Sequence, residues 1–235
     1  IIIDDFSSDN SIELINSYKD PRIKFFKNKK NIGQTASLNI GISKAQSNYI
    51  ARIDQDDVCL PKRLEDQFSF LKENPSISVI CSYEYIIDSS NNIIGSWKRN
   101  LRDYGEFFGY ILLGIVPIWT PSVMFVKNHI IELSGYNEDS GPASDLDLWS
   151  KIALKRYNAY ILPEFHLLQR QHQGSQSAEF NKLQTNITHK IHREVLESFS
   201  HHDDIDMLRS FLILEKGQKK VPLNVLNMPL PGNSG

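Results

Sequence analysis

The N-terminal part of the chain alternates between short apolar runs and longer segments in which apolar residues recur at helical spacing. The runs at 1–5 ("IIIDD"), 22–27 ("RIKFFK") and 49–53 ("YIARI") predict strands, because short continuous apolar runs are typical of buried strands. The segment that follows Ser8 and the segment 34–45 predict helices. Each connection is long enough for a crossover, so this alternation indicates a mostly parallel sheet.

The rest of the chain continues as an α/β pattern. Asn74 and Pro75 end a predicted helix, and a hairpin is expected around residues 89–91. We therefore expect one α/β domain over residues 1–177 and a helical extension with a frayed tail over 178–235. The predicted helices cover 62–74, 102–114, 144–156 and 178–199, and the predicted strands cover 77–81, 83–87, 92–97, 121–127, 159–164 and 165–172.

Acidic residues follow two of the predicted strands directly. Asp4 and Asp5 end the first, and Asp54, Asp56 and Asp57 follow the third. In an open α/β sheet, ligands bind at the carboxyl ends of the strands, so the fold should bring these acids together. Carboxylates this close repel one another and raise each other's pKa unless a cation lies among them. Oxygen-rich sites of this kind favour Mg²⁺ or Mn²⁺.

Two other interpretations of the stretch "DQDDV" are open at this point. A solvated acidic loop could simply cap the helix that opens at Pro61, because acids are favourable near a helix N-terminus. The stretch also satisfies the D-x-D-x-[TV] pattern of haloacid-dehalogenase-like phosphatases, in which Asp54 would be the nucleophile and Asp56 the acid. In that family, however, the strand that ends in two acids follows the nucleophile, whereas here "IIIDD" precedes it.

Several spaced blocks favour a different enzyme class. They are "IIIDDFSSDNS", "NKKNIGQTASLNIGISKAQSNYIARIDQDDVCLPKRLEDQ", "TPSVMFVK", "SGYNE…SDLDLW" and "LQRQHQGSQS". In this order they resemble the blocks of a family 2 glycosyltransferase with the GT-A fold, over about residues 1–177. The resemblance implies a Rossmann-like α/β fold in which helices flank a mixed, mostly parallel sheet, with a C-terminal helical extension.

The resemblance assigns roles to individual acids. It implies that Asp5 contacts the nucleobase, Asp56 the ribose, and Asp57 a Mg²⁺ or Mn²⁺ ion, with His172 near the metal or the diphosphate. Asp54 would shape the loop or bind the metal through water. The alternative for Asp5 is that it caps the following helix together with Asp4, because "DFSSD" is also a turn and cap sequence.

The stretch "SDLDLW" matches the block in which the family carries its catalytic base. The resemblance places that base at Asp145, while Ser144 stands where the family usually has Glu. A carboxylate at this position would take the proton of the attacking acceptor hydroxyl. The alternative is a helix start at which Ser144 or Asp145 is the N-cap.

The composition of the chain limits the classes of ligand and the cellular compartment that can be expected. The formal charge is -2, from 26 Lys and Arg against 28 Asp and Glu, without a long basic run, so nucleic acid is not expected as a ligand. Two cysteines suit a reducing compartment, which indicates a cytoplasmic protein. The apolar stretch 110–119 is about half the length of a membrane span. The family resemblance adds peripheral association with the inner face of the cell membrane.

The expected function follows from the resemblance. It implies metal-dependent, inverting transfer of a sugar from a nucleotide-sugar donor, a UDP-sugar above all, to a saccharide or lipid-linked acceptor in surface polysaccharide or glycolipid synthesis. A first strand and helix of the family fold, roughly 30 to 40 residues by the size of a βα unit, are expected upstream of the "IIIDD" strand. A catalytically inactive module that only binds a nucleotide is the alternative.

Overall fold

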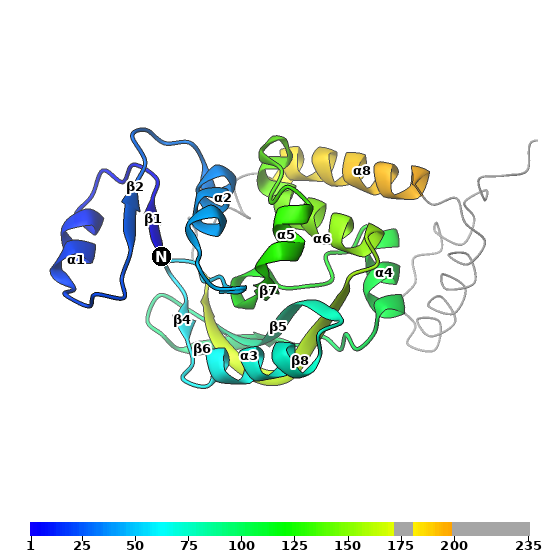
Figure 1. The fold of residues 1–235 in the computed structure, drawn as a ribbon, viewed down its shortest axis with the longest axis horizontal. Helices are drawn as coiled ribbons and strands as arrows, with labels where there is room; N and C mark the ends of the chain where they lie inside the picture. The colour runs from blue at the N-terminus through cyan, green and yellow to red at the C-terminus, as the bar shows by residue number, and fades with distance from the viewer. Residues whose placement is uncertain (172–180, 199–235) are drawn as a thin grey trace, which may run out of the picture.

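The computed structural model describes residues 1–171 and 181–198, which form a mixed sheet flanked by helices (Figure 1). Every predicted strand of residues 1–171 is present, and the two predicted closing strands are joined in one long strand. The strands are β1 (Ile2–Asp4), β2 (Phe25–Lys27), β3 (Tyr49–Ala51), β4 (Val58–Cys59), β5 (Ile77–Ile87), β6 (Ile93–Trp97), β7 (Met124–Val126) and β8 (Asn158–Arg170).

The larger sheet has the order β3-β7-β5-β8-β4, with β6 paired to β5. Its two long central strands, β5 and β8, are parallel, whereas β7 runs antiparallel to both β3 and β5. The hairpin predicted around residues 89–91 is confirmed as the antiparallel pair β5–β6. The predicted mixed sheet is therefore confirmed: β1–β2 and the long β5–β8 ladder are parallel, and the other four pairings are antiparallel and shorter than β5–β8.

The first three strands do not form one ladder. β1 and β2 make a separate parallel pair, in which Ile3 lies opposite Phe26, and β3 pairs with β7 instead. β1 and β2 lie with the first helix at one end of the molecule (Figure 1). The strand–helix–strand order permits such parallel pairing but does not specify neighbours, and β3 offers only three residues to a partner.

The predicted helices are present with boundaries shifted by a few residues. The short elements α5, η1 and η2, which carry too few residues for a periodic pattern, were not predicted. The helices are α1 (Ser11–Ser17), α2 (Gln34–Lys44), α3 (Arg63–Glu73), α4 (Tyr104–Leu112), α5 (Lys127–Glu132), α6 (Ser144–Leu154) and α8 (Asn181–Glu197), with 3₁₀ turns η1 (Thr120–Ser122) and η2 (Glu138–Ala143).

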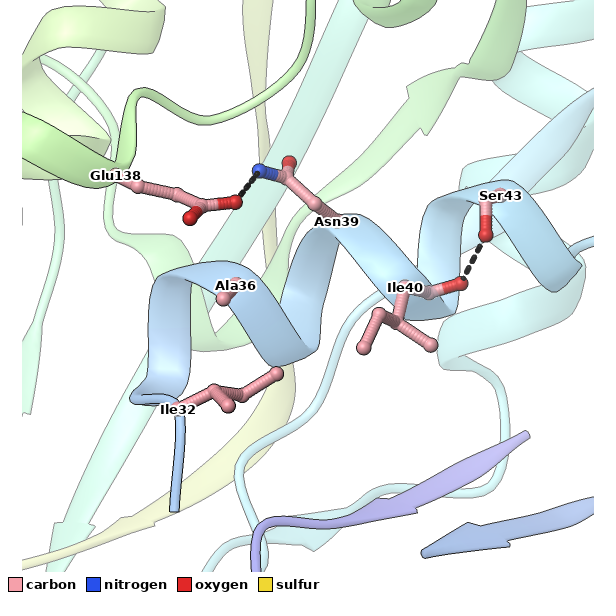
Figure 2. A pocket seen from close by; sticks show the side chains of 6 residues that line it. All are labelled: Ile32, Ala36, Asn39, Ile40, Ser43 and Glu138. Atoms are coloured by element: carbon pink, nitrogen blue, oxygen red, sulfur yellow. Dashed lines mark hydrogen bonds between the residues drawn. The ribbon is translucent and has the colours of Figure 1, made fainter. Parts of the chain in front are cut away.

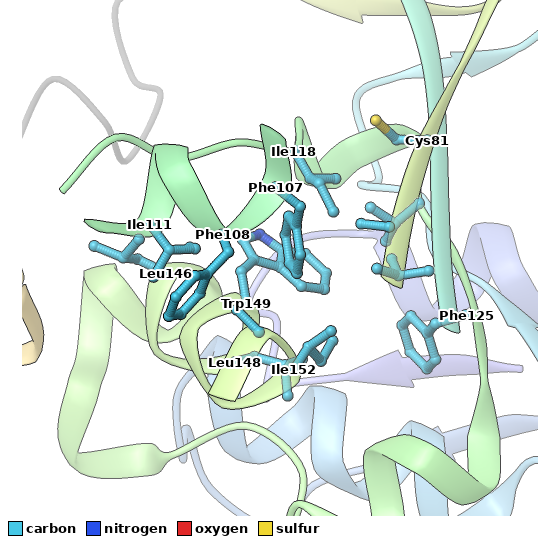
Figure 3. Packing of buried hydrophobic residues seen from close by; sticks show 14 of the residues in the cluster. Cys81, Phe107, Phe108, Ile111, Ile118, Phe125, Leu146, Leu148, Trp149 and Ile152 are labelled. Atoms are coloured by element: carbon cyan, nitrogen blue, oxygen red, sulfur yellow. The ribbon is translucent and has the colours of Figure 1, made fainter. Parts of the chain in front are cut away.

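The main core lies where α4 and α6 pack against the sheet (Figure 3). Leu148 and Trp149 of α6 are fully buried there beside Phe107 of α4. Ile191 and Val195 of α8 join the same core. Burial of such side chains contributes roughly 1.5 to 3 kcal/mol each, which fixes the N-terminal turn of α6 relative to the sheet. The boundary predicted at 177/178 lies outside the described residues, and the two-part division stays a prediction.

The apolar stretch 110–119 forms the end of α4 and the loop after it, as expected for a core segment. Ile111, Leu112 and Ile118 are buried in the main core. Among residues 1–171 and 181–198, none of the helices combines the length and the apolar character needed to cross a bilayer.

Candidate active site

The acidic loop, residues 54–57, lies between β3 and β4 and is tied to two strands by arginines. Arg52 Nη2 donates to Asp54 Oδ1 at 3.0 Å. Arg170, the last residue of β8, donates its backbone N–H to Asp57 Oδ1 at 2.8 Å and its Nε–H to the Asp56 carbonyl oxygen at 3.0 Å. β3, β5 and β8 run in the same direction, so the loop lies at their carboxyl ends, as predicted.

Asp57 is the most perturbed acid of this loop. Its pKa is raised to about 6, mainly by partial burial and also by the nearby charges of Asp56 and Asp54, against the lowering effect of the hydrogen bond from the Arg170 N–H. A half-buried carboxylate among like charges is stabilised when a divalent cation joins it. The loop does not cap α3, because that helix has Lys62 at its N-cap and no side-chain cap hydrogen bond. The capping interpretation is therefore wrong.

Arg52 links the acidic loop to a second acid that is distant in sequence. Its side chain is only 8% exposed, and its guanidinium lies between Asp54 and Asp145, with Nη1 3.3 Å from Asp145 Oδ1. Its backbone carbonyl accepts a hydrogen bond from Nη2 of Arg63, which is itself buried in α3. Burying a guanidinium is costly unless it is paired or hydrogen-bonded, and Arg52 has both carboxylates as partners. The strand end is thereby held in one position relative to both carboxylates.

Asp145 lies in the first turn of α6. Its desolvation raises its pKa, against the lowering effects of the Arg52 charge and of a hydrogen bond from the Thr120 side chain, while Asp54 raises it further. Its side chain keeps 34% of its surface exposed, so an acceptor hydroxyl can reach it. The N-cap of α6 is Ala143, without a side-chain cap hydrogen bond. The alternative in which Ser144 or Asp145 is the N-cap is therefore wrong.

Asp5, at the end of β1, organises the loop that leads into α2. Its Oδ1 accepts from Asn28 Nδ2 and from the Ile32 N–H, each at 2.9 Å, and its Oδ2 accepts from the Gly33 N–H at 2.8 Å. Burial would raise its pKa, but these hydrogen bonds hold it below the usual range. Gly33 has φ +90°, which L side chains rarely adopt. The carboxylate of Asp5 therefore shapes this loop.

The capping role considered for Asp4 and Asp5 is wrong. α1 has Asn10 at its N-cap, and the Ser11 N–H donates a hydrogen bond to Asp9 Oδ1. The remaining predicted site residue, His172, lies outside the described residues. The roles of Asp5, Asp56 and His172 toward a ligand stay predictions.

Three residues of the site were not predicted from the sequence. Arg52 stands near the end of an apolar strand, where a charged residue needs a partner, and that position was the available signal. Arg170 ends β8 in a similar way. Glu84 is fully buried in β5, and its pKa is raised to about 8, mainly by desolvation and also by the charge of Asp57, against the lowering effect of Arg63. Glu84 lies within the predicted strand "YEYII", and the alternation of residues in that strand did not predict that this carboxyl group would be buried.

Two pockets lie along α2. One of about 440 Å³ is bordered by α2 and η2, where Asn39 Nδ2 donates to Glu138 Oε1 at 3.5 Å (Figure 2). Asn39 also pairs with both backbone groups of Tyr136, which fastens α2 to the segment before α6. A neighbouring pocket includes Thr35, whose Oγ1 lies 3.3 Å from Ser144 Oγ. The surface between α2 and η2 thus leads toward the start of α6.

Comparison with known proteins identifies the class that this fold and site define. Residues 1–131 match the family described as Glycosyl transferase family 2, and the chain belongs to that family. An uncharacterized glycosyltransferase of Methanocaldococcus jannaschii is 35% identical over 172 residues, which cover 72% of this chain and 59% of that protein. The amylovoran biosynthesis glycosyltransferase AmsE of Erwinia amylovora is 41% identical over 135 residues, 57% of this chain and 49% of AmsE.

The fold is also found among solved structures. The crystal structure of S. aureus TarS 1-349 in complex with UDP-GlcNAc matches with a TM-score of 0.67 at 15% sequence identity, over 95% of this chain and 67% of that one. The GT-A fold, predicted from the resemblance, is thereby confirmed. The chain spans about three fifths of the length of the M. jannaschii relative.

Proposed function

We propose that this chain carries the catalytic machinery of a metal-dependent, inverting glycosyltransferase that uses a nucleotide-sugar donor. The observation that supports this most directly is the position of Arg52 between Asp54 and Asp145. This guanidinium connects the acidic loop, which would hold the leaving group, to Asp145, the carboxylate that would take the proton. Transfer of a glycosyl group needs both functions around one carbon atom.

Asp57 would hold Mg²⁺ or Mn²⁺, with His172 as a further ligand. The structural test of this fit is the half-buried carboxyl of Asp57, whose pKa is raised by desolvation and by two neighbouring acids. A hard divalent ion bound by one or two carboxylates and by substrate phosphates matches that donor set. When bound, the cation supplies positive charge that stabilises the departing nucleoside diphosphate.

Asp145 would act as the general base. It accepts the proton of the acceptor hydroxyl while the hydroxyl oxygen bonds to the anomeric carbon, and the bond between that carbon and the diphosphate oxygen breaks with its electron pair. Attack on the face opposite the diphosphate inverts the anomeric configuration. Desolvation raises the pKa of Asp145 and so makes its carboxylate a stronger base than an ordinary one, while the charge of Arg52 acts in the opposite direction and favours the ionised form.

The donor and acceptor are proposed by class. TarS binds UDP-GlcNAc in its crystal structure, which supports a UDP-sugar donor here. Asp5 would recognise the base and Asp56 the ribose. The description of AmsE as an amylovoran biosynthesis enzyme supports a saccharide or lipid-linked acceptor in surface polysaccharide synthesis. Such an acceptor would place the protein in the cytoplasm, at the inner face of the membrane.

Substitution of Asp145 tests the proposal. The protein should transfer sugar from a nucleotide sugar with Mn²⁺ or Mg²⁺ and stop when EDTA is added. Asp145→Asn should lower kcat by about 10² to 10⁴-fold, which is the usual contribution of a general base. Asp139→Asn, an exposed acid in η2, is the matched control and should keep full activity. Equal activity in the two variants would refute the role of Asp145.

Binding measurements separate this proposal from an inactive nucleotide-binding module. Calorimetry with UDP and Mn²⁺ reports binding by itself, and product analysis reports transfer or hydrolysis. Mn²⁺-dependent binding without product from any of a panel of donors and acceptors would favour the module. The presence of both the Asp57 and the Asp145 carboxyl groups, linked through the Arg52–Asp54 ion pair and its loop, supports the enzyme.

A further inference from the structure

A second cluster of side chains that could hold a metal ion lies between α3 and β8. Asp66 comes from α3, and Glu164 and His166 come from β8. One ligand atom from each lies within 4.8 Å of the other two. His166 Nε2 is 2.9 Å from Asp66 Oδ2 and 3.6 Å from Glu164 Oε2. None of these residues has a role in the proposed transfer reaction.

The distances suit a shared cation. With ligand bonds of about 2.0 to 2.1 Å, a tetrahedral ion places neighbouring ligand atoms roughly 3.3 Å apart. The two separations measured from His166 Nε2, to Asp66 and to Glu164, lie on either side of this value. Only a small movement of the carboxylates is therefore needed to enclose an ion.

The imidazole of His166 is already oriented for such a role. Its side chain is 3% exposed, and its Nδ1 lies 2.9 Å from Ser82 Oγ, which also accepts from Gln67 Nε2 at 2.9 Å. Metal-binding histidines are usually held through the ring nitrogen that does not bind the metal. When Nδ1–H donates to Ser82, the lone pair of Nε2 points toward the two carboxylates.

A hydrogen bond alone does not satisfy this cluster. The single Nε2–H can donate to Asp66, but the 3.6 Å separation to Glu164 exceeds hydrogen-bond length. Within hydrogen-bond length the imidazole therefore pairs with Asp66 alone, while Glu164 lies close enough to join the other two residues around a shared cation. Glu164 has 62% of its side chain exposed, which leaves a path from solvent.

We propose that Asp66, Glu164 and His166 form a structural site for a first-row divalent cation of the Zn²⁺ type. One imidazole nitrogen with two carboxylates suits such an ion better than Mg²⁺, which prefers oxygen ligands alone. The ion would fasten α3 to β8. Because the Leu60 N–H donates to the His166 carbonyl oxygen at 2.9 Å, the chain that leaves the acidic loop is held to the same point.

The test uses the Asp57→Asn protein, in which the proposed ion of the acidic loop has lost its carboxylate ligand. After treatment with EDTA, Zn²⁺ should raise the Tm, and Co²⁺ should give the visible absorption of a nitrogen- and oxygen-ligated ion. Mg²⁺ should leave the Tm unchanged. Stabilisation follows because the folded state alone presents the assembled ligands.

Added substitutions locate the ion. Glu164→Gln and Asp66→Asn, each placed in the Asp57→Asn protein, should weaken Zn²⁺ binding at least tenfold. Glu65→Gln removes the same charge from an exposed neighbour on α3 and should bind Zn²⁺ normally. Binding as tight in Glu164→Gln as in Glu65→Gln would overturn the proposal, and Glu164 is exposed enough for its variant to fold. Because turnover is not measured, this result is independent of the proposed transferase activity.

Discussion

Arg52 Nη1 lies 3.3 Å from Asp145 Oδ1, although the two residues are 93 positions apart in the chain. The same guanidinium donates to Asp54 at 3.0 Å. One buried cation therefore balances two acids, one at the end of a strand and one at the start of a helix. The charges of Arg52 and Asp54 both influence the pKa of Asp145, the proposed base, and the effect of each charge can be measured.

Replacement of Arg52 should move the pH profile. Its positive charge lowers the pKa of Asp145, so Arg52→Gln should shift the acid limb of kcat/KM upward by about one pH unit. Removing one partner of a buried ion pair typically costs about 3 to 5 kcal/mol, so the free energy of unfolding should also fall. Rate profiles measured at temperatures where the variant is folded provide the check. An unshifted acid limb would contradict the coupling.

Replacement of Asp54 should move the same limb in the opposite direction. The charge of Asp54 raises the pKa of Asp145, so Asp54→Asn should lower the apparent pKa of kcat/KM. The variant should keep metal-dependent transfer, whereas Asp57→Asn should lose it. An upward shift would be contrary to this prediction. Loss of all activity with Asp54→Asn would also contradict it, and the family match already excludes the phosphatase interpretation in which Asp54 is the nucleophile.

Glu84 should make stability depend on pH. Its folded pKa is about 8 and its ordinary value is 4.5, so the folded state retains a proton that the unfolded state loses. This contribution is complete below pH 4.5 and is lost as the pH rises through 8. Between pH 6 and 8, the free energy of unfolding of the wild type should fall by about 2 kcal/mol relative to Glu84→Gln.

Denaturant titrations at several pH values measure that difference. Arg63, Asp57 and Asp54 are the charged groups that act on Glu84, and they are unchanged in the Gln variant. Glu65→Gln on the exposed face of α3 is the control and should follow the wild type. A constant difference between wild type and Glu84→Gln over this range would show that Glu84 does not titrate there.

Asp5→Asn tests the loop that precedes α2. The amide oxygen replaces only one of two carboxylate acceptors, so the N–H of Ile32 or of Gly33 loses its partner. We expect a loss of about 1 to 3 kcal/mol in unfolding free energy and a higher KM for the donor. Asp9→Asn, which removes an exposed charge near α1, should leave that KM unchanged. A normal donor KM in Asp5→Asn would argue against its nucleotide role.

Local sequence determined the strands, most helices and the acidic loop. Apolar periodicity acts over a few residues, and "YIARI" followed by "DQDD" places acids at a strand end wherever that strand lies. The spaced blocks identified the glycosyltransferase family and selected Asp145 by their order. The partners of the strands were not determined in this way, because pairing of β3 with β7 joins segments that are more than 70 residues apart.

The tertiary structure alone decided which charges meet. The sequence resemblance gave Asp54 only a role in shaping the loop or in binding the metal through water, and the structure adds an ion pair with Arg52, which also reaches Asp145. Glu84 and His166 looked like ordinary strand residues until burial showed that one carboxyl has its pKa raised and one imidazole faces two acids. The interaction of a charged group depends on its distance from groups elsewhere in the chain and on its desolvation. Both quantities are set only when the elements pack.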